Sequence, residues 1–154
     1  MTIAELLNTN IVLFSAIIGW VSAQVLKTLI HLILSRKFVI ERLVGSGGMP
    51  SCHSSTVCAL ATSALLHYGF DSFEFAISAI FAIVVMYDAM GVRRQAGKQA
   101  VVLNQLICLF QDLENRKIST EQKLKELVGH TPLQVFAGAI LGVCVSLSLY
   151  FTLH

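Results

Sequence analysis

Apolar residues gather into four long stretches that alternate with short polar segments along the chain. A helix needs roughly 20 mostly apolar residues to cross the hydrocarbon core of a bilayer. The pattern therefore predicts an all-α, polytopic membrane helical bundle with about four transmembrane helices, forming a single integral-membrane domain over residues 1–154. The expected helices cover residues 11–34, 54–70, 73–90 and 132–153.

The polar segment 91–130 has its own helical pattern. In VRRQAGKQAVVLNQLICLF the apolar residues recur at helical spacing, and Arg94, Gln95 and Lys98 share the polar face. We expect an amphipathic helix here that lies against the membrane surface or against the other helices. A capping-box pattern at 119–122 predicts a second short helix, with a loop over residues 112–120.

The composition agrees with a membrane protein. Hydrophobic residues make up 55% of the chain and charged residues 13%, with a mean hydropathy of +0.74. Ordinary soluble domains carry about 25% charged residues, so we expect membrane lipids as partners and no nucleic acid. The N-terminal MTIAELLNTN lacks a basic region, so the first apolar stretch is expected to be a retained helix. The four cysteines form no CxxC pair, which favours free thiols and no metal site.

The charges predict an orientation. With four crossings, all 11 Lys and Arg residues fall on one side, whereas the loop on the opposite side carries only Asp71 and Glu74. The positive-inside rule places the basic side in the cytoplasm, with both termini outside. We expect the plasma membrane of a bacterium, with the site-bearing loops on the cytoplasmic side.

Two histidines on the basic side lie at expected helix starts. His53 is in GSGGMPSCHSS (45–55), where the second helix starts near Ser51. His130 precedes Thr131 and Pro132, an N-cap and first helical residue. Helix N-termini bind anions through unpaired N–H groups.

Glycines and arginines around these histidines suit phosphoryl transfer. Gly47 and Gly48 would let backbone amides approach an oxyanion, and arginine offers forked donors for phosphate. One imidazole can attack phosphorus while the other protonates the leaving oxygen. The alternative is structural: interfacial histidines that only donate hydrogen bonds, and basic residues that contact lipid headgroups.

Three motifs carry a resemblance to a known family. The segments GGMPSCHSS, YDAMGVRRQAGKQAVVLN and GHTPLQVFAGAILG, in this order, resemble the divergent branch of the type-2 phosphatidic acid phosphatase family. Its members are often labelled acid phosphatase/vanadium-dependent haloperoxidase-related. The similarity covers nearly the whole chain and implies a membrane phosphatase that needs no metal or cofactor.

The resemblance also implies catalytic residues. Pro50-Ser51-Cys52-His53 is similar to the Pro-Ser-Gly-His motif of the broader superfamily, so His53 would be the general acid. His130 would be the phosphorylated nucleophile. The family has a supporting carboxylate four residues later, where this chain has Gln134, which can orient an imidazole but supplies no charge.

Other family positions differ. Leu124 replaces an arginine, and the first superfamily motif, a lysine followed by an Arg-Pro pair, is not recognisable. Asp88 could supply the missing carboxylate or pair with a nearby arginine, and Lys27 could reach the phosphate or extend to the headgroups. The predicted phosphate-binding residues are Arg42, Gly47, Gly48, Ser51, Arg93, Arg94 and Lys98, with Asp88, Gln134 and Lys27 in support.

The residues and the resemblance together predict a membrane-embedded phosphatase that hydrolyses a lipid phosphate or isoprenoid pyrophosphate through a phosphohistidine intermediate. The alternative is a non-catalytic membrane protein that binds a phosphorylated headgroup in a degenerate pocket. Vanadate-dependent halide oxidation is disfavoured by the incomplete set of cations. The small face formed by Gly138 and Gly142 could serve a homodimer as easily as an internal contact.

Overall fold

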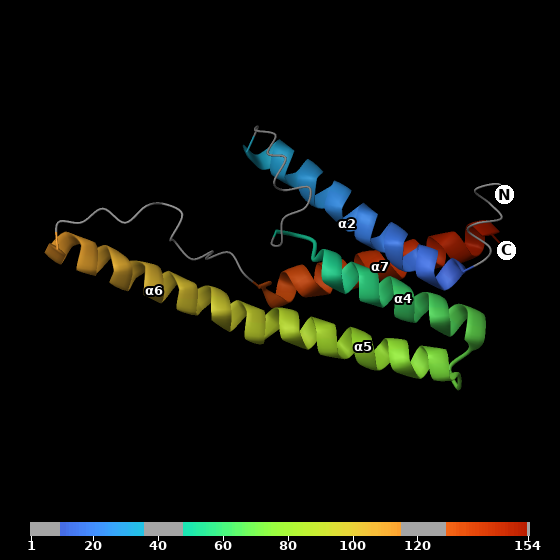
Figure 1. The fold of residues 1–154 in the computed structure, drawn as a ribbon. Helices are drawn as coiled ribbons and strands as arrows, with labels where there is room; N and C mark the ends of the chain where they lie inside the picture. Colours follow the sequence, from blue (N-terminus) through green and yellow to red (C-terminus); the bar gives the residue numbers. More distant parts are fainter. Residues whose placement is uncertain (1–9, 36–47, 115–128, 154) are drawn as a thin grey trace.

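The computed structural model describes residues 10–35, 48–114 and 129–153 of the chain. Within these ranges the chain is all-helical, as predicted. The helices are α2 (Ile11–Ser35), α4 (Cys52–Tyr68), α5 (Phe73–Met90), α6 (Val92–Glu114) and α7 (Pro132–Leu153) (Figure 1). The bounds of α5 and α7 coincide with the expected ones, whereas α4 begins two residues earlier than predicted because Ser51 acts as its N-cap.

α4 lies at the centre of the bundle, in contact with α2, α5 and α7. Ser55 on α4 donates through Oγ to the carbonyl of Gly19 on α2 at 2.8 Å. On the other side, a Cβ atom on Gly142 of α7 would lie 2.3 Å from the Ser55 carbonyl oxygen. Glycines therefore let both neighbours approach the α4 backbone closely. Of the two uses predicted for the Gly138 and Gly142 face, the structure shows the internal contact.

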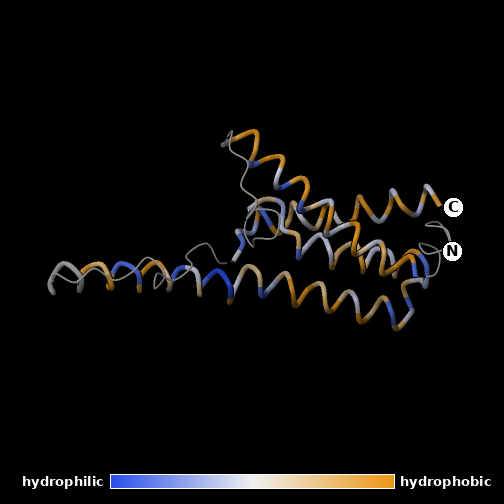
Figure 2. Tube along the Cα trace, turned by 45° about the horizontal axis from the view of Figure 1, so that its top comes forward, coloured by the Kyte–Doolittle hydropathy of each residue, from blue (hydrophilic) through white to orange (hydrophobic). Residues whose placement is uncertain are grey.

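Three helical stretches of the described chain are long and apolar enough to cross a membrane: Ile11–Leu34, Phe73–Leu109 and Pro132–Leu153. Figure 2 shows hydrophobic residues along the bundle helices and a hydrophilic stretch where α5 passes into α6. α4 is not among the three, since its 17 residues span only about 25 Å. A fourth crossing by α4 stays a prediction.

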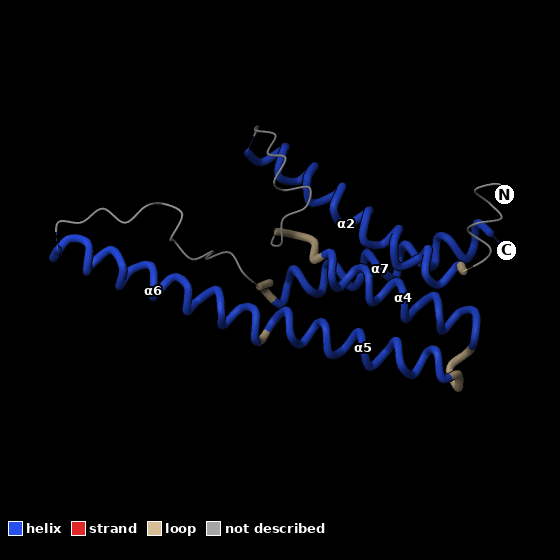
Figure 3. The backbone as a smooth tube through the Cα atoms, in the orientation of Figure 1, coloured by secondary structure: helices blue, strands red, loops and turns tan. Residues whose placement is uncertain are grey.

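α6 continues α5 in nearly the same direction (Figures 1 and 3). Backbone hydrogen bonds bridge the junction, because Gly91 N donates to the Tyr87 carbonyl at 2.8 Å and Gln95 N to the Gly91 carbonyl at 3.0 Å. Among the described helices α6 contacts α5 alone, so it does not pack against the rest of the bundle. A position at the membrane surface stays a prediction.

The end of α6 corrects one expectation. Residues 112–114, predicted to begin a loop, are the last residues of the helix. The capping box expected at 119–122 lies outside the described residues.

Candidate functional site

The starts of α4 and α7 lie side by side. Ser51 N donates to the Gln134 carbonyl at 3.0 Å, and a Cβ atom on Gly138 would lie 2.3 Å from the Ser51 carbonyl oxygen. Because the two helices run parallel from this contact, the residues at their N-termini meet. His53 and His130 form an edge-to-face pair with ring centroids 5.9 Å apart and an interplanar angle of 69°.

His130 is held in place by backbone contacts. The backbone N–H of His130 donates to the Ala89 carbonyl at the end of α5, at 3.1 Å. The residue is 4% exposed. Gly129 has a φ of +94°, and a Cβ atom there would lie 2.4 Å from Arg94 N. Only glycine fits this left-handed conformation against the backbone of the α5–α6 junction.

The surroundings of the His130 ring lower its pKa and so favour its neutral form. Burial lowers its pKa below 6.5, and the positive charges of Lys27 and Arg93 and the neighbouring His53 lower it further. A backbone hydrogen bond with Gly129 acts in the opposite direction and raises the pKa. Since that bond favours the protonated ring, the Gly129 carbonyl is the acceptor. The other ring nitrogen is then left to attack an electrophile.

His53 shares the electrostatic environment of His130. Burial lowers the pKa of His53 first, then the charges of Arg93 and Lys27, while Asp88 raises it. His53 lies in the first turn of α4, outside the three candidate spans. Cations from two further elements, α2 and α6, therefore act on both imidazoles.

Lys27 reaches the site because it continues a packing ridge of α2. Ser15, Gly19 and Ala23 recur every fourth residue and are buried, and Ser15 and Gly19 make hydrogen bonds to α4. Lys27 comes one turn later, beyond the start of α4, and is 3% exposed. A Cβ atom on Gly48 would lie 3.1 Å from its Cδ atom. The side chain is buried in the protein and does not extend to the headgroups, which was one of its two predicted positions.

Arg93, whose charge acts on both histidines, is paired with a carboxylate. Its Nε atom lies 2.5 Å from Oδ2 of Asp88, and both side chains are partly exposed. This is the ion pair that was one of the two alternatives for Asp88. A guanidinium has five N–H donors, so this contact leaves others for an anion.

The remaining predicted cations are placed differently. Arg94 and Lys98 are exposed, and neither is among the charges that shift the pKa of His53 or His130. Lys98 instead lines an apolar surface hollow of about 450 Å³ on α6. Arg42 and Gly47 lie outside the described residues.

Two residues expected at the phosphate or at His130 are capping residues. Ser51 is fully buried, its N–H donates to Gln134, and its Oγ accepts from Ser54 N at 3.3 Å and from Ser54 Oγ at 3.0 Å. Gln134 Oε1 accepts from Thr131 N at 3.0 Å, and Gln134 N donates to Thr131 Oγ1 at 3.4 Å. This is a capping box, so the hydrogen bond printed for the Gln134 side chain goes to Thr131 N.

These caps leave the start of α4 as the better anion site. At α7, Pro132 has no N–H, and the capping box uses the donors of Thr131 and Gln134. At α4, the N–H groups of Cys52 and His53 have no hydrogen-bond acceptor within the described part of the chain. Unpaired N–H groups at a helix start carry partial positive charge and favour an anion.

The sequence agrees with a family that fits this geometry. Residues 8–145, which include both histidines, Lys27 and Arg93, match the sequence pattern of the Divergent PAP2 family. This chain belongs to the Divergent PAP2 family. It is 44% identical over 153 residues to "Uncharacterized membrane protein YuiD" of Bacillus subtilis (strain 168), covering 94% of this chain and 97% of that protein. No solved structure matches it. Together with the three apolar spans, this family membership makes the chain an integral membrane protein.

Two parts of the site in this family member could have been predicted from signals in the sequence. The glycine directly before His130 marks the left-handed residue that passes against the backbone of Arg94. The four-residue spacing of small residues on α2 ends at Lys27 and predicts that Lys27 faces α4.

Proposed function

We propose that this protein hydrolyses a lipid phosphate or diphosphate in the membrane, with His130 as the nucleophile and His53 as the general acid. The observation that carries the proposal is the pairing of these rings, 5.9 Å apart, at the junction of two helix starts. Attack needs roughly 3–3.5 Å between the reacting atoms, and proton transfer needs about 2.6–3.2 Å. A phosphoryl group bound beside the pair, in contact with one nitrogen of each ring, would meet both requirements.

The proposed reaction has two steps. A ring nitrogen of His130 attacks phosphorus, the bond from phosphorus to the lipid oxygen breaks with its electron pair on oxygen, and His53 supplies the proton. Water then attacks the phosphorus of the phosphohistidine, and the bond from phosphorus to the His130 nitrogen breaks with its electron pair on nitrogen. His53 accepts the water proton, and inorganic phosphate is released. The neutral His130 ring favoured by burial is the form that can attack.

Charge stabilisation would come from three sources. The charges of Lys27 and Arg93 act on both imidazoles and would therefore act on a phosphoryl group bound beside them. The N–H groups of Cys52 and His53 add the partial charge of a helix start. Preorganised donors of this kind are worth about 10²- to 10³-fold each in rate.

The test is phosphate release by the purified, detergent-solubilised protein in EDTA. The substrates are phosphatidate, diacylglycerol pyrophosphate, and isoprenyl phosphates and diphosphates. We expect release that His130→Ala abolishes for every substrate and that His53→Ala lowers about 10²- to 10⁴-fold for monophosphates. Acid-labile labelling of the wild type, absent from His130→Ala, would identify the intermediate. A folded wild type that releases no phosphate from the whole panel would refute the proposal.

A second function, binding of a phosphorylated headgroup without turnover, is favoured by one observation. Gln134 stands where the resemblance to the broader superfamily implies a carboxylate, and its Oε1 caps α7. A binding protein would keep its affinity for a lipid phosphate in His130→Ala and lose it in Arg93→Gln. A catalyst would lose turnover in His130→Ala whether or not affinity changes.

We also propose that the site faces the cytoplasm across a bacterial plasma membrane. Lys27, Arg93 and Arg94 lie at the end of the bundle where α4 and α7 begin, whereas the turn between α4 and α5 carries Asp71. The positive-inside rule supports this orientation. A membrane-impermeant thiol reagent added to intact cells should label Asp71→Cys but not Arg94→Cys in a cysteine-free background. The reverse pattern would refute it.

A further inference from the structure

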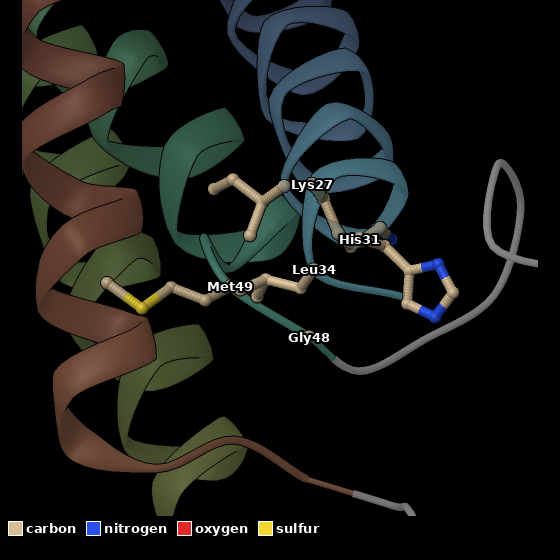
Figure 4. Close-up of a pocket in the computed structure, with 6 residues that line it drawn as sticks. Lys27, His31, Leu34, Gly48 and Met49 are labelled. Carbon is tan, nitrogen blue, oxygen red and sulfur yellow. The ribbon is translucent and has the colours of Figure 1, made fainter. Parts of the chain in front are cut away.

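Two hollows in the described part of the chain differ in what surrounds them. The first lies between α2 and the segment that leads into α4, and residues of both line it, Lys27 and Met49 among them (Figure 4). The second lies on α6, and its described lining residues all belong to that helix: Lys98, Gln99, Val102 and Leu103. Among the described helices α6 contacts α5 alone, so none of the others covers this second hollow.

The hollow on α6 belongs to a longer apolar surface, the α6 stripe, which consists of Val102, Leu103, Leu106 and Leu109. These side chains are 45–60% exposed, and steps of three and four residues connect them along one side of the helix. Lys98 borders the stripe, because it lines the same hollow as Val102 and Leu103. An exposed apolar face bordered by lysine is typical of a helix in the membrane interface, where the ammonium reaches the headgroups.

The α6 stripe continues the exposed side of α5. Ile80 and Val84 lie in a candidate membrane span and are 63% and 58% exposed. Val102 follows Val84 by 18 residues, about five turns of an α-helix, and backbone hydrogen bonds carry the helix across the junction at Gly91. The side chains of Val84 and Val102 therefore point to nearly the same side.

The length of this apolar stretch exceeds the thickness of a bilayer. α5 alone has 18 residues and spans about 27 Å, close to the roughly 30 Å of the hydrocarbon core. The stretch Phe73–Leu109 has 37 residues and is about 55 Å long, too long to fit the core even at a tilt of about 40°. α6 therefore begins near the membrane surface, and its stripe reaches lipid only if the helix turns along that surface.

We propose that α6 beyond Arg94 is a membrane-surface anchor, with the α6 stripe in the lipid interface beside α5 and Lys98 at anionic headgroups. Because the stripe and the exposed side of α5 face the same way, a bend over the neighbouring lipid turns the stripe down onto the membrane. A bend over the bundle would turn it towards water. Helices kink at glycines, and Gly97 lies in α6 beyond the contact of Gly129 with the Arg94 backbone. A bend there leaves the histidine site unchanged.

Charge favours a lipid surface over a second copy of the chain as the partner of the stripe. Two copies in one membrane share a two-fold axis along the membrane normal, so two projecting α6 helices would pair in the same direction. That pairing brings the two Lys98 ammonium groups towards each other. An anionic lipid surface instead attracts each basic side chain near it by about 1 kcal/mol.

The experiment measures the access of oxygen and of a water-soluble nickel chelate to a nitroxide label on the full-length protein. The protein is reconstituted in vesicles of phosphatidylglycerol and phosphatidylcholine. One protein is labelled at Leu106→Cys and its matched control at the native, exposed Cys108, with every other cysteine replaced by serine in both. Two residues are about 160° apart around a helix. We expect a higher ratio of oxygen to nickel access at position 106 than at 108.

Lys98→Gln should lower the ratio at position 106, because a loss of about 1 kcal/mol reduces the population on the surface about fivefold. An unchanged ratio in this variant would refute the role of Lys98. Equal access of the nickel chelate to both positions would show that α6 projects into water and would refute the anchor. A label at 106 that neither reagent reaches would show that protein covers the stripe, a second copy included, and would also refute it. These outcomes do not depend on the phosphatase function.

Discussion

Gly138→Ala tests whether the contact between α4 and α7 sets the geometry of the histidine pair. A Cβ atom at this position would lie 2.3 Å from the Ser51 carbonyl oxygen and 3.1 Å from its Cβ. Ordinary contact begins at 3.4 Å, so the two helices must separate by about 1 Å at the level of the site. The methyl group would thus part the helix starts that carry His53 and His130.

The expected loss follows from two contributions. Inserting a methyl group into a packed interface costs about 1–3 kcal/mol. Weakening the hydrogen bond from Ser51 N to the Gln134 carbonyl costs about 1 kcal/mol more. We expect the free energy of unfolding to fall by about 2–4 kcal/mol. A displacement of about 1 Å between reacting groups can lower the rate about 10²-fold.

The measurements are SDS-induced unfolding in detergent micelles and phosphate release at saturating substrate. Gly142→Ala, one turn further from the histidines, makes an equally close contact with the Ser55 carbonyl oxygen at 2.3 Å. It should destabilise the bundle by a similar amount and affect turnover less. Ile140→Ala on the half-exposed face is the control and should change stability by less than Gly138→Ala. A Gly138→Ala protein with wild-type stability and turnover would refute the reasoning.

Three further predictions concern the residues around the pair. Gly129 has a φ of +94° and lies against the backbone of Arg94, so Gly129→Ala should shift His130 and lower kcat about 10²-fold. The amount of protein in the membrane fraction should stay the same. An unchanged kcat would show that Gly129 does not position the ring. The pKa of His130 is lowered below 6.5, so the acidic limb of the kcat/KM profile should lie below pH 6.5. The free energy of unfolding should fall as the pH drops below 6.5, because the unfolded chain then binds more protons than the folded one. Lys27→Met should move the acidic limb to higher pH, because it removes a charge that lowers the pKa of His130. Lys98→Met should leave the limb in place. The same shift in both variants would contradict the placement of Lys27. Arg93→Gln should raise KM about tenfold or more while its neighbour Arg94→Gln changes KM little, and equal effects would show that both arginines contribute only to the general positive field.

The local features of the fold could be predicted from the sequence because they depend on neighbouring residues. Apolar runs of sufficient length predicted the extents of α2, α5 and α7, since burial in lipid requires the backbone to satisfy its own hydrogen bonds. Thr131 and Pro132 identified the start of α7. The continuation of α5 into α6 was missed, because Gly91 reads as a break although hydrogen bonds bridge it.

The selection of site residues needed the tertiary structure. The sequence places five candidate cations near the same membrane face, of which the structure describes Lys27, Arg93, Arg94 and Lys98. It could not show which of them approach the histidines, because that depends on how α2 packs on α4 and on how α6 leaves α5. The charges of Lys27 and Arg93 act on both rings, whereas Arg94 and Lys98 are not among the charges that shift the pKa of either ring.

The chain by itself determined that this is a helical membrane protein with His53 and His130 at two helix starts, since periodicity, length and capping are local properties. Only the tertiary structure decided that these starts lie together and that Ser51 and Gln134 are capping residues. It also decided that the backbone N–H of His130 donates to the Ala89 carbonyl at the end of α5. The physical reason is that a buried polar group forms its hydrogen bond with a partner that packing brings close. Contacts between residues far apart in the sequence decide which partner that is.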